Sequence, residues 1–262
     1  MVRARAREAG VSSLIVVGYD LPSSRSAVRT AAKYGDAAAV GIHPHDAKTA
    51  TETALAHIQE LAVQMPVVAV GETGLDYHYN FSSPELQQQA FRQHIRLARK
   101  LLLPLVIHCR DAFDDLFTIL DEEEASEVGG VIHCFTGSVE DAHRAVQRGF
   151  FVGMSGVVTF PRSEMIREAA SSIPIDRLLM ETDCPYMAPQ PVRGRRCEPS
   201  HLRFTSDALA RLRNLTAAEL EQVCDSNAIR CFPLLRRVAP VPGCTDEVPT
   251  GAEGRSAVPD LT

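Results

Sequence analysis

The sequence predicts an α/β fold of the (β/α) TIM-barrel type, with seven of its eight strands present in the chain. Short apolar runs alternate with segments of helical periodicity, and those segments are long enough to connect parallel strands. Several of the apolar runs also end in an imidazole or a carboxylate. Because (β/α) barrels carry their chemistry at the carboxyl ends of the strands, these polar residues predict an active centre there.

Seven short apolar segments are the predicted strands, near residues 14, 38, 67, 105, 130, 151 and 178. The central one, V-V-A-V-G-E-T-G-L-D-Y-H at 67–78, has four β-favouring residues before Gly71 and stops being apolar at Glu72. A short apolar run bounded by glycine is typical of a strand buried on both faces. A barrel closes at eight strands, and the chain opens inside a helical segment. We therefore expect the missing strand to be the first, upstream of Met1.

Helical periodicity predicts seven helices between these strands, at residues 1–9, 24–34, 51–63, 84–102, 113–124, 139–148 and 163–172. Pro84 suits the first turn of its helix, and Gly149 suits a helix end. From about residue 238 the chain loses periodicity and becomes rich in proline and glycine. The sequence therefore predicts one folded domain over residues 1–237 and a disordered tail over 238–262.

Composition limits the classes of partner. The 27 Lys and Arg residues against 33 Asp and Glu give a net charge of −6, so any contact with nucleic acid must come from a local patch or a bound metal. No apolar run approaches the roughly 20 residues of a membrane span, and the arginine-rich start lacks the apolar stretch of a secretory signal. Seven cysteines without a CxxC pair do not indicate a disulfide framework. We expect a cytoplasmic protein with no membrane association, and no obligate protein partner is evident.

Four strand ends carry the residues that make a metal site the leading hypothesis. Glu72, His108 and His133 follow apolar runs directly, and Asp183 closes the segment L-L-M-E-T-D at 178–183. Any one of them alone is equally well explained as a satisfied buried histidine or a helix-capping aspartate. Together, mixed imidazole and carboxylate donors suit Zn, Mn or Mg, and two such cations can generate hydroxide and stabilise both oxygens of a phosphodiester.

The motifs around these residues resemble those of a known family. G-E-T-G-L-D-Y at 71–77, V-I-H-C-R-D-A at 106–112, I-H-C-F-T-G at 132–137 and E-T-D-C-P-Y at 181–186 resemble the TatD family of metal-dependent deoxyribonucleases, which are amidohydrolase-like TIM barrels. G-I-H-P-H-D at 41–46 and R-G-R-R-C-E-P at 193–199 extend the resemblance, which covers about residues 11–233.

The resemblance implies a two-metal site. Glu72 matches the carboxylate that bridges the cations, His108 and His133 match the imidazole ligands of one, and Asp183 matches the aspartate on the other. The family takes two more ligands from an H-x-H at the end of its first strand, which this chain does not contain. Asp183 would orient or deprotonate the attacking water, so Glu72 and Asp183 are the predicted catalytic residues.

The second histidine pair, His43 and His45, forms an H-P-H sequence. Relatives in the family carry a similar H-P-H in addition to their first-strand pair. The resemblance therefore favours a contact with substrate or support of the ligands over direct metal binding.

Further polar residues are weaker candidates for the site. Arg193, Arg195 and Arg196 lie in a loop where they either hold substrate phosphate or are merely solvated. Asp76 and Arg110 flank the predicted ligands and either support them by hydrogen bonds or form salt bridges at the rim of the barrel.

The function that we expect is hydrolysis of phosphodiester bonds by a metal-dependent exonuclease that trims DNA ends. One alternative keeps the barrel and the metal but takes an aminoacyl-tRNA ester as substrate. Another is a truncated, inactive barrel, because the chain lacks the first-strand ligands and exposes two sheet edges. The arginine-rich opening within a helix favours a start assigned too late in the gene.

Overall fold

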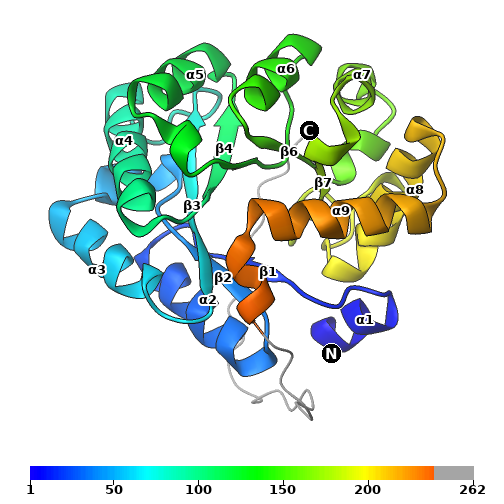
Figure 1. The fold of residues 1–262 in the computed structure, drawn as a ribbon, viewed down its shortest axis with the longest axis horizontal. Coiled ribbons are helices and arrows are strands. Elements are labelled where there is room, and N and C mark those ends of the chain that lie inside the picture. Colours follow the sequence, from blue (N-terminus) through cyan, green and yellow to red (C-terminus); the bar gives the residue numbers. More distant parts are fainter. Residues whose placement is uncertain (239–262) are drawn as a thin grey trace.

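The computed structural model describes residues 1–238, in which seven parallel strands form one sheet enclosed by helices (Figure 1). The strands are β1 (Ile15–Val17), β2 (Ala37–Val40), β3 (Val67–Asp76), β4 (Leu105–Arg110), β5 (Gly130–Ile132), β6 (Phe151–Met154) and β7 (Leu178–Met180). Each strand pairs with the next along the chain, and within the described residues β1 and β7 are the two edges of the curled sheet. The predicted seven-stranded α/β barrel fold is confirmed.

Nine α-helices occur among these residues. They are α1 (Val2–Glu8), α2 (Leu21–Tyr34), α3 (Glu52–Ala62), α4 (Pro84–Leu101), α5 (Phe113–Glu122), α6 (Val139–Gln147), α7 (Glu164–Ser172), α8 (Leu202–Arg213) and α9 (Ala217–Cys231). The first seven lie where periodicity predicts them. Helix α2 begins earlier than expected because the carboxylate of Asp20 accepts a hydrogen bond of 2.7 Å from the backbone N–H of Ser23. Helices α8 and α9 lie beyond the predicted alternation of strands and helices.

The strands pack apolar side chains on both faces, which explains their continuous apolar sequences. The outer faces pack against the helices, where large buried side chains include Phe91, Phe117, Phe135 and Phe150. A second cluster lies inside the curve of the sheet and comes mainly from the amino-terminal parts of the strands: Ala37, Ala39, Val68, Ala69, Val106, Val131, Phe151 and Leu179. This inner cluster leaves the carboxyl ends of the strands as the place for polar residues.

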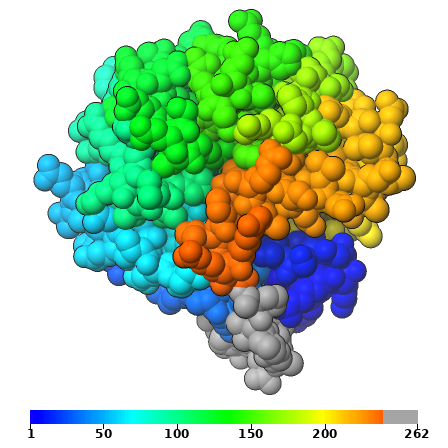
Figure 2. Space-filling view, viewed as in Figure 1, coloured from blue at the N-terminus to red at the C-terminus, as the bar shows by residue number. Residues whose placement is uncertain are grey.

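The end of α9 and the short 3-10 helix η7 (Pro233–Arg237) cover this inner cluster. Cys231 and Phe232 are 4% exposed and belong to it, and Leu234 and Leu235 pack against it. Figure 2 shows these segments, in orange, in the middle of the face turned to the viewer. The amino-terminal end of the barrel is thus closed by the polypeptide itself, and the candidate site lies at the opposite end.

Strand β3 is ten residues long and continues through Glu72 to Asp76. The apolar run stops at Glu72, but the strand does not end there. The register of β3 against β4 shifts between Val70 and Thr73. Gly74 has φ +138°, and a Cβ atom there would clash with the carbonyl oxygen of His108. The glycine therefore lets β4 approach closely, which brings the side chains of Glu72 and His108 together.

The predicted tail, residues 238–262, lies outside the described residues except for Val238. No helix within residues 1–238 combines the length and the apolar character needed to cross a bilayer.

Candidate metal centre

The predicted site residues gather at the carboxyl ends of the strands, because the strands are parallel and end at one edge of the sheet. Glu72 and Asp76 belong to β3, and His108 and Arg110 to β4. His133 follows β5 directly, Asp183 follows β7, and His43 and His45 follow β2. The arginines 193, 195 and 196 lie further along the chain, between β7 and α8.

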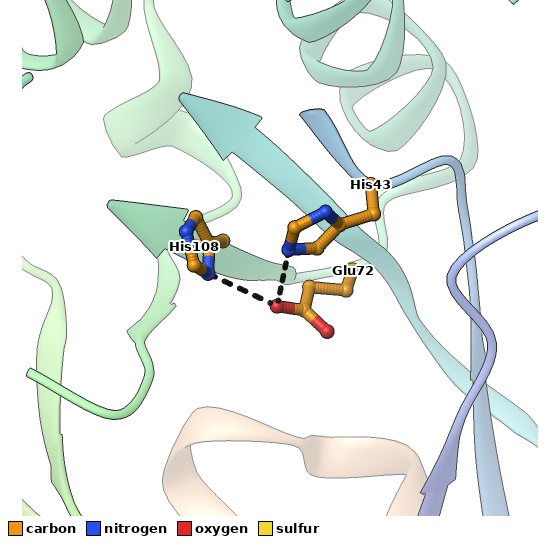
Figure 3. A group of neighbouring side chains, drawn as sticks. All are labelled: His43, Glu72 and His108. Atoms are coloured by element: carbon orange, nitrogen blue, oxygen red, sulfur yellow. Dashed lines mark ion pairs between the residues drawn. The ribbon is translucent and has the colours of Figure 1, made fainter. Parts of the chain in front are cut away.

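One carboxylate oxygen of Glu72 is the point on which three imidazoles converge. Oε1 of Glu72 lies 2.7 Å from Nε2 of His133, 3.3 Å from Nε2 of His43 and 3.3 Å from Nδ1 of His108. Figure 3 shows His43 and His108 approaching this oxygen from two different elements. One ligand atom from each of His43, Glu72 and His108 lies within 4.8 Å of the others, so these three residues could hold one cation.

Asp76 orients two of the histidines. Its Oδ2 lies 2.9 Å from Nε2 of His108 and 3.0 Å from Nε2 of His45. Its Oδ1 accepts hydrogen bonds from the backbone N–H groups of His78 and Tyr79. Histidines that bind metals commonly donate their second ring nitrogen to a carboxylate, which fixes the ring. The Asp76 side chain is 1% exposed, and its contacts favour support of His108 over a solvated salt bridge at the rim.

The two histidines of the H-P-H sequence occupy different positions. Nδ1 of His43 accepts a hydrogen bond of 3.1 Å from the backbone N–H of His45, which turns Nε2 of His43 toward Glu72. His45 instead meets Asp76. His43 is therefore a candidate ligand, although the resemblance favours a substrate contact or a supporting role for it, whereas the place of His45 agrees with a supporting role.

Glu181 is a site residue that the sequence analysis did not identify. Its Oε1 lies 3.5 Å from Nδ1 of His133 and accepts a hydrogen bond from the backbone N–H of Cys134. His133 is consequently held between the carboxylates of Glu72 and Glu181. The motif E-T-D at 181–183 carries two carboxylates, and the one nearer to the strand is the signal in the sequence for Glu181.

Asp183 has no hydrogen bond or ion pair to its carboxylate within residues 1–238. Burial raises the pKa of Asp183 to about 7, the imidazole of His133 opposes this rise, and the charges of Glu72 and Glu181 add to it. A half-buried carboxylate without a partner is costly, and a cation would remove that cost. This observation fits a divalent metal.

Glu72 shows the opposite behaviour. Burial favours its neutral form, but the charge of His133 and the hydrogen bonds from His108, His133 and His43 outweigh burial and hold the pKa of Glu72 well below its ordinary value. The pKa of His43 is lowered by burial, which favours the neutral imidazole that binds metals. Nitrogen and carboxylate oxygen donors in this arrangement suit Zn or Mn.

The predicted arginines lie outside this cluster of carboxylates and imidazoles. Arg193, Arg195 and Arg196 are exposed, and the guanidinium carbon of Arg193 lies 3.8 Å from the ring centroid of Phe160. Within the described part of the chain no hydrogen bond or ion pair engages the three guanidinium groups. Arg110 is equally without an ion pair among residues 1–238, so the described residues offer no partner for the alternative role of Arg110 in a salt bridge at the rim.

Comparison with known proteins gives the family of the chain. The family model described as TatD related DNase matches residues 1–233. The chain is 43% identical over 229 residues to the uncharacterized metal-dependent hydrolase YabD of Bacillus subtilis, covering 87% of this chain and 90% of that protein. It is 40% identical over 235 residues to the 3'-5' ssDNA/RNA exonuclease TatD of Cronobacter sakazakii, covering 87% and 89%.

Solved structures agree with the sequence comparison. The crystal structure of YJJV, a TatD homolog from Escherichia coli K12, has a TM-score of 0.82 and 32% identity, covering 88% of this chain and 90% of that one. A TatD family hydrolase from Entamoeba histolytica has a TM-score of 0.79 and 25% identity, covering 88% of each chain.

Proposed function

The chain belongs to the family of TatD related DNases and is a metal-dependent hydrolase, and from this premise we propose that it is an exonuclease that hydrolyses phosphodiester bonds at the ends of DNA. The observation that carries the proposal is the convergence of three imidazoles on the Glu72 carboxylate at the carboxyl ends of the strands. The 3'-5' ssDNA/RNA exonuclease named among the relatives supports a nucleic acid as the substrate. A cytoplasmic location is part of the same proposal.

His43, Glu72 and His108 would hold one divalent cation, since their ligand atoms already lie within 4.8 Å of one another. His133 and Asp183 would supply further donors if a second cation binds beside Glu72. The grouping implied by the resemblance, His108 with His133 on one cation, stays a prediction. Bound divalent cations supply a nucleophilic hydroxide at neutral pH and stabilise the charge on the phosphate oxygens.

The chain's own residues have separate tasks in this proposal. Glu72 provides the fixed negative charge that anchors the cations, because its pKa is held low. Asp183, whose carboxylate has no hydrogen-bonding partner in the described residues, orients the attacking water and accepts its proton. Asp76 keeps the His108 ring turned toward Glu72 through the 2.9 Å contact with Nε2.

The loop that carries Arg193, Arg195 and Arg196 would bind the phosphates of the substrate strand. Arg195 and Arg196 are exposed and have no ion pair among residues 1–238, so binding an anion would cost them no existing contact. Arginine forms paired hydrogen bonds with phosphate oxygens, and such contacts position a strand without reading its sequence.

Chelation and metal return test the proposal directly. The protein is stripped with EDTA, its metal content is measured, and Mg, Mn or Zn is added before incubation with end-labelled single-stranded DNA. We expect no cleavage after stripping and stepwise shortening from one end after metal return. An aminoacyl-tRNA serves as the second substrate. A metal-loaded protein that leaves DNA intact, or cleavage that survives chelation, would contradict the proposal.

A further inference from the structure

A pair of aromatic rings lies in the loop between β3 and α4, beside the candidate metal centre. The rings of Tyr79 and Phe81 stack with centroids 5.4 Å apart and an angle of 9° between their planes. The ring of His45 meets both edge-on, at 5.5 Å from Tyr79 and 4.9 Å from Phe81. Phe81 is nevertheless 60% exposed, so a large part of its apolar surface faces water.

Polar contacts next to the exposed ring anchor this loop. The anchor is Ser82, which is 3% exposed and donates a hydrogen bond of 2.9 Å to the carbonyl of His45. Gln87 adds hydrogen bonds of 2.9 Å to the carbonyls of Ser82 and Asp76. Because these polar contacts fix the loop, packing alone does not account for an exposed phenylalanine at position 81.

The aromatic pair is connected to the candidate metal centre through His45. The ring centroid of His45 lies 6.2 Å from that of His108, and both rings contact the same oxygen of Asp76. Two steps from ring to ring therefore separate the exposed face of Phe81 from an imidazole of the metal centre.

The guanidinium group of Arg110 lies next to the aromatic pair and has no ionic partner among residues 1–238. The guanidinium carbon of Arg110 is 4.9 Å from the ring centroid of Tyr79, and no ion pair or hydrogen bond occupies this guanidinium within the described residues. Arginine over an aromatic ring retains its capacity to bind phosphate. Stacking rings next to a free cation are the combination with which proteins bind single-stranded nucleic acid.

We propose that Phe81 and Tyr79 form a stacking site for an unpaired base at the end of the substrate strand, with Arg110 binding an adjacent phosphate. The inference rests on the proposed function and assigns residues of this chain to the binding of the strand end. A base inside a duplex has both faces stacked on its neighbours and cannot lie on Phe81. Every base has an apolar face, so the site accepts all four.

Binding without catalysis tests the stacking site. Metal-stripped protein is titrated into single-stranded DNA that carries the fluorescent base 2-aminopurine at either end, and its quenching reports stacking. The variants are Phe81→Leu, which keeps an apolar side chain but loses the aromatic face, and Phe81→Trp, which restores one. Tyr34→Leu is the matched control, because Tyr34 ends α2 and lies before β2, at the closed end of the barrel.

We expect the wild type and Phe81→Trp to quench the fluorescence, and Phe81→Leu to bind about tenfold more weakly with little quenching. Tyr34→Leu should behave as the wild type. An oligonucleotide whose terminal nucleotide lacks its base should bind the wild type and Phe81→Leu equally. Thermal unfolding of each variant checks that the fold is intact.

Cleavage by the metal-loaded proteins separates the two levels of the proposal. Phe81→Leu should raise KM for single-stranded ends and leave kcat nearly unchanged, since the ring does not touch the reacting bond. A wild type that cleaves, with unchanged binding, quenching and KM in Phe81→Leu, would overturn the stacking site alone. A metal-loaded wild type that cleaves no nucleic acid would overturn the proposed function and the stacking site with it.

Discussion

The two sides of the candidate metal centre hold their carboxylates in opposite ways. On the side of β3 and β4, Asp76 contacts two imidazoles and accepts two backbone N–H groups, and these contacts outweigh burial and lower the pKa of Asp76 far below its usual range. On the side of β7, Asp183 has no such contact among the described residues, and burial raises its pKa to about 7. The contacts of Asp76 keep its carboxylate ionised, whereas the carboxylate of Asp183 would be stabilised by a bound cation.

The difference teaches which part of the site the polypeptide organises by itself. Hydrogen bonds hold His108, His45 and Asp76 in place without a ligand, as expected for preorganised support of a metal. The Asp183 side is incompletely satisfied, so ligand binding and stability are coupled there. Four experiments test this division, beginning with the largest expected effect.

Glu72→Gln should abolish most of the activity. The change removes the negative charge that the two sides share, and we expect loss of bound metal and a fall in DNA cleavage of at least about 100-fold. Metal analysis and cleavage of end-labelled DNA measure both effects. Glu140→Gln, at an exposed position in the first turn of α6, is the matched control. Equal and small losses in the two variants would show that Glu72 is not the centre of the site.

Acid should lower the stability of the protein through His94, which lies on α4 and supports the backbone next to His43. This buried histidine accepts a hydrogen bond of 3.1 Å from the N–H of Ile42 next to His43, and its other ring nitrogen contacts the carbonyl of Ala90. Burial lowers the pKa of His94 from 6.5 to about 4. Between these values the unfolded chain binds a proton that the folded one does not. The contribution of neutral His94 to the free energy of unfolding is therefore fully present above pH 6.5, and it falls by up to about 3 kcal/mol toward pH 4.

Urea unfolding of the wild type and His94→Gln between pH 7 and pH 4.5 measures this contribution. We expect His94→Gln to be less stable at pH 7 and to lose less stability on acidification, so the two curves converge. Parallel curves would exclude His94 as the acid-sensitive group.

Asp183→Asn should stabilise the metal-free protein at pH 7.5. The unfolded carboxyl titrates near 3.8 and the folded one near 7, so ionisation favours unfolding as pH rises through this window. Removing the acid should raise the free energy of unfolding by about 1–3 kcal/mol. This is less than the full pKa shift implies, because solvent screens part of the charge. With saturating Mn the order should reverse, because the wild type gains more from binding. A variant stabilised equally with and without metal would contradict the pairing of Asp183 with a cation.

His43→Ala has the smallest expected effect and decides the role of the H-P-H sequence. If His43 binds the metal, its loss should weaken metal binding by about tenfold or more. Metal titration followed by isothermal calorimetry measures it, with exposed His143→Ala as the control. Unchanged affinity in His43→Ala would return His43 to the supporting role that the sequence analysis favoured.

Much of the fold follows from local patterns in the sequence. The seven strands lie where apolar runs predict them, and seven helices lie where periodicity predicts them. Helices α8 and α9 were not predicted, because the strand and helix alternation that guides the prediction ends after β7. The start of α2 depends on the side chain of Asp20, a capping contact that periodicity does not report.

The candidate site divides in the same way. The sequence by itself determined which chemical groups follow the apolar runs, since Glu72, His108 and His133 each come directly after one, and parallel strands bring these groups to one end of the sheet. Only the tertiary structure decided that His43 faces Glu72, that Glu181 holds His133, and that Phe81 lies beside His45. The reason is physical: such contacts depend on strand register, on the clearance at Gly74 and on loop paths, all of which join residues distant in the chain.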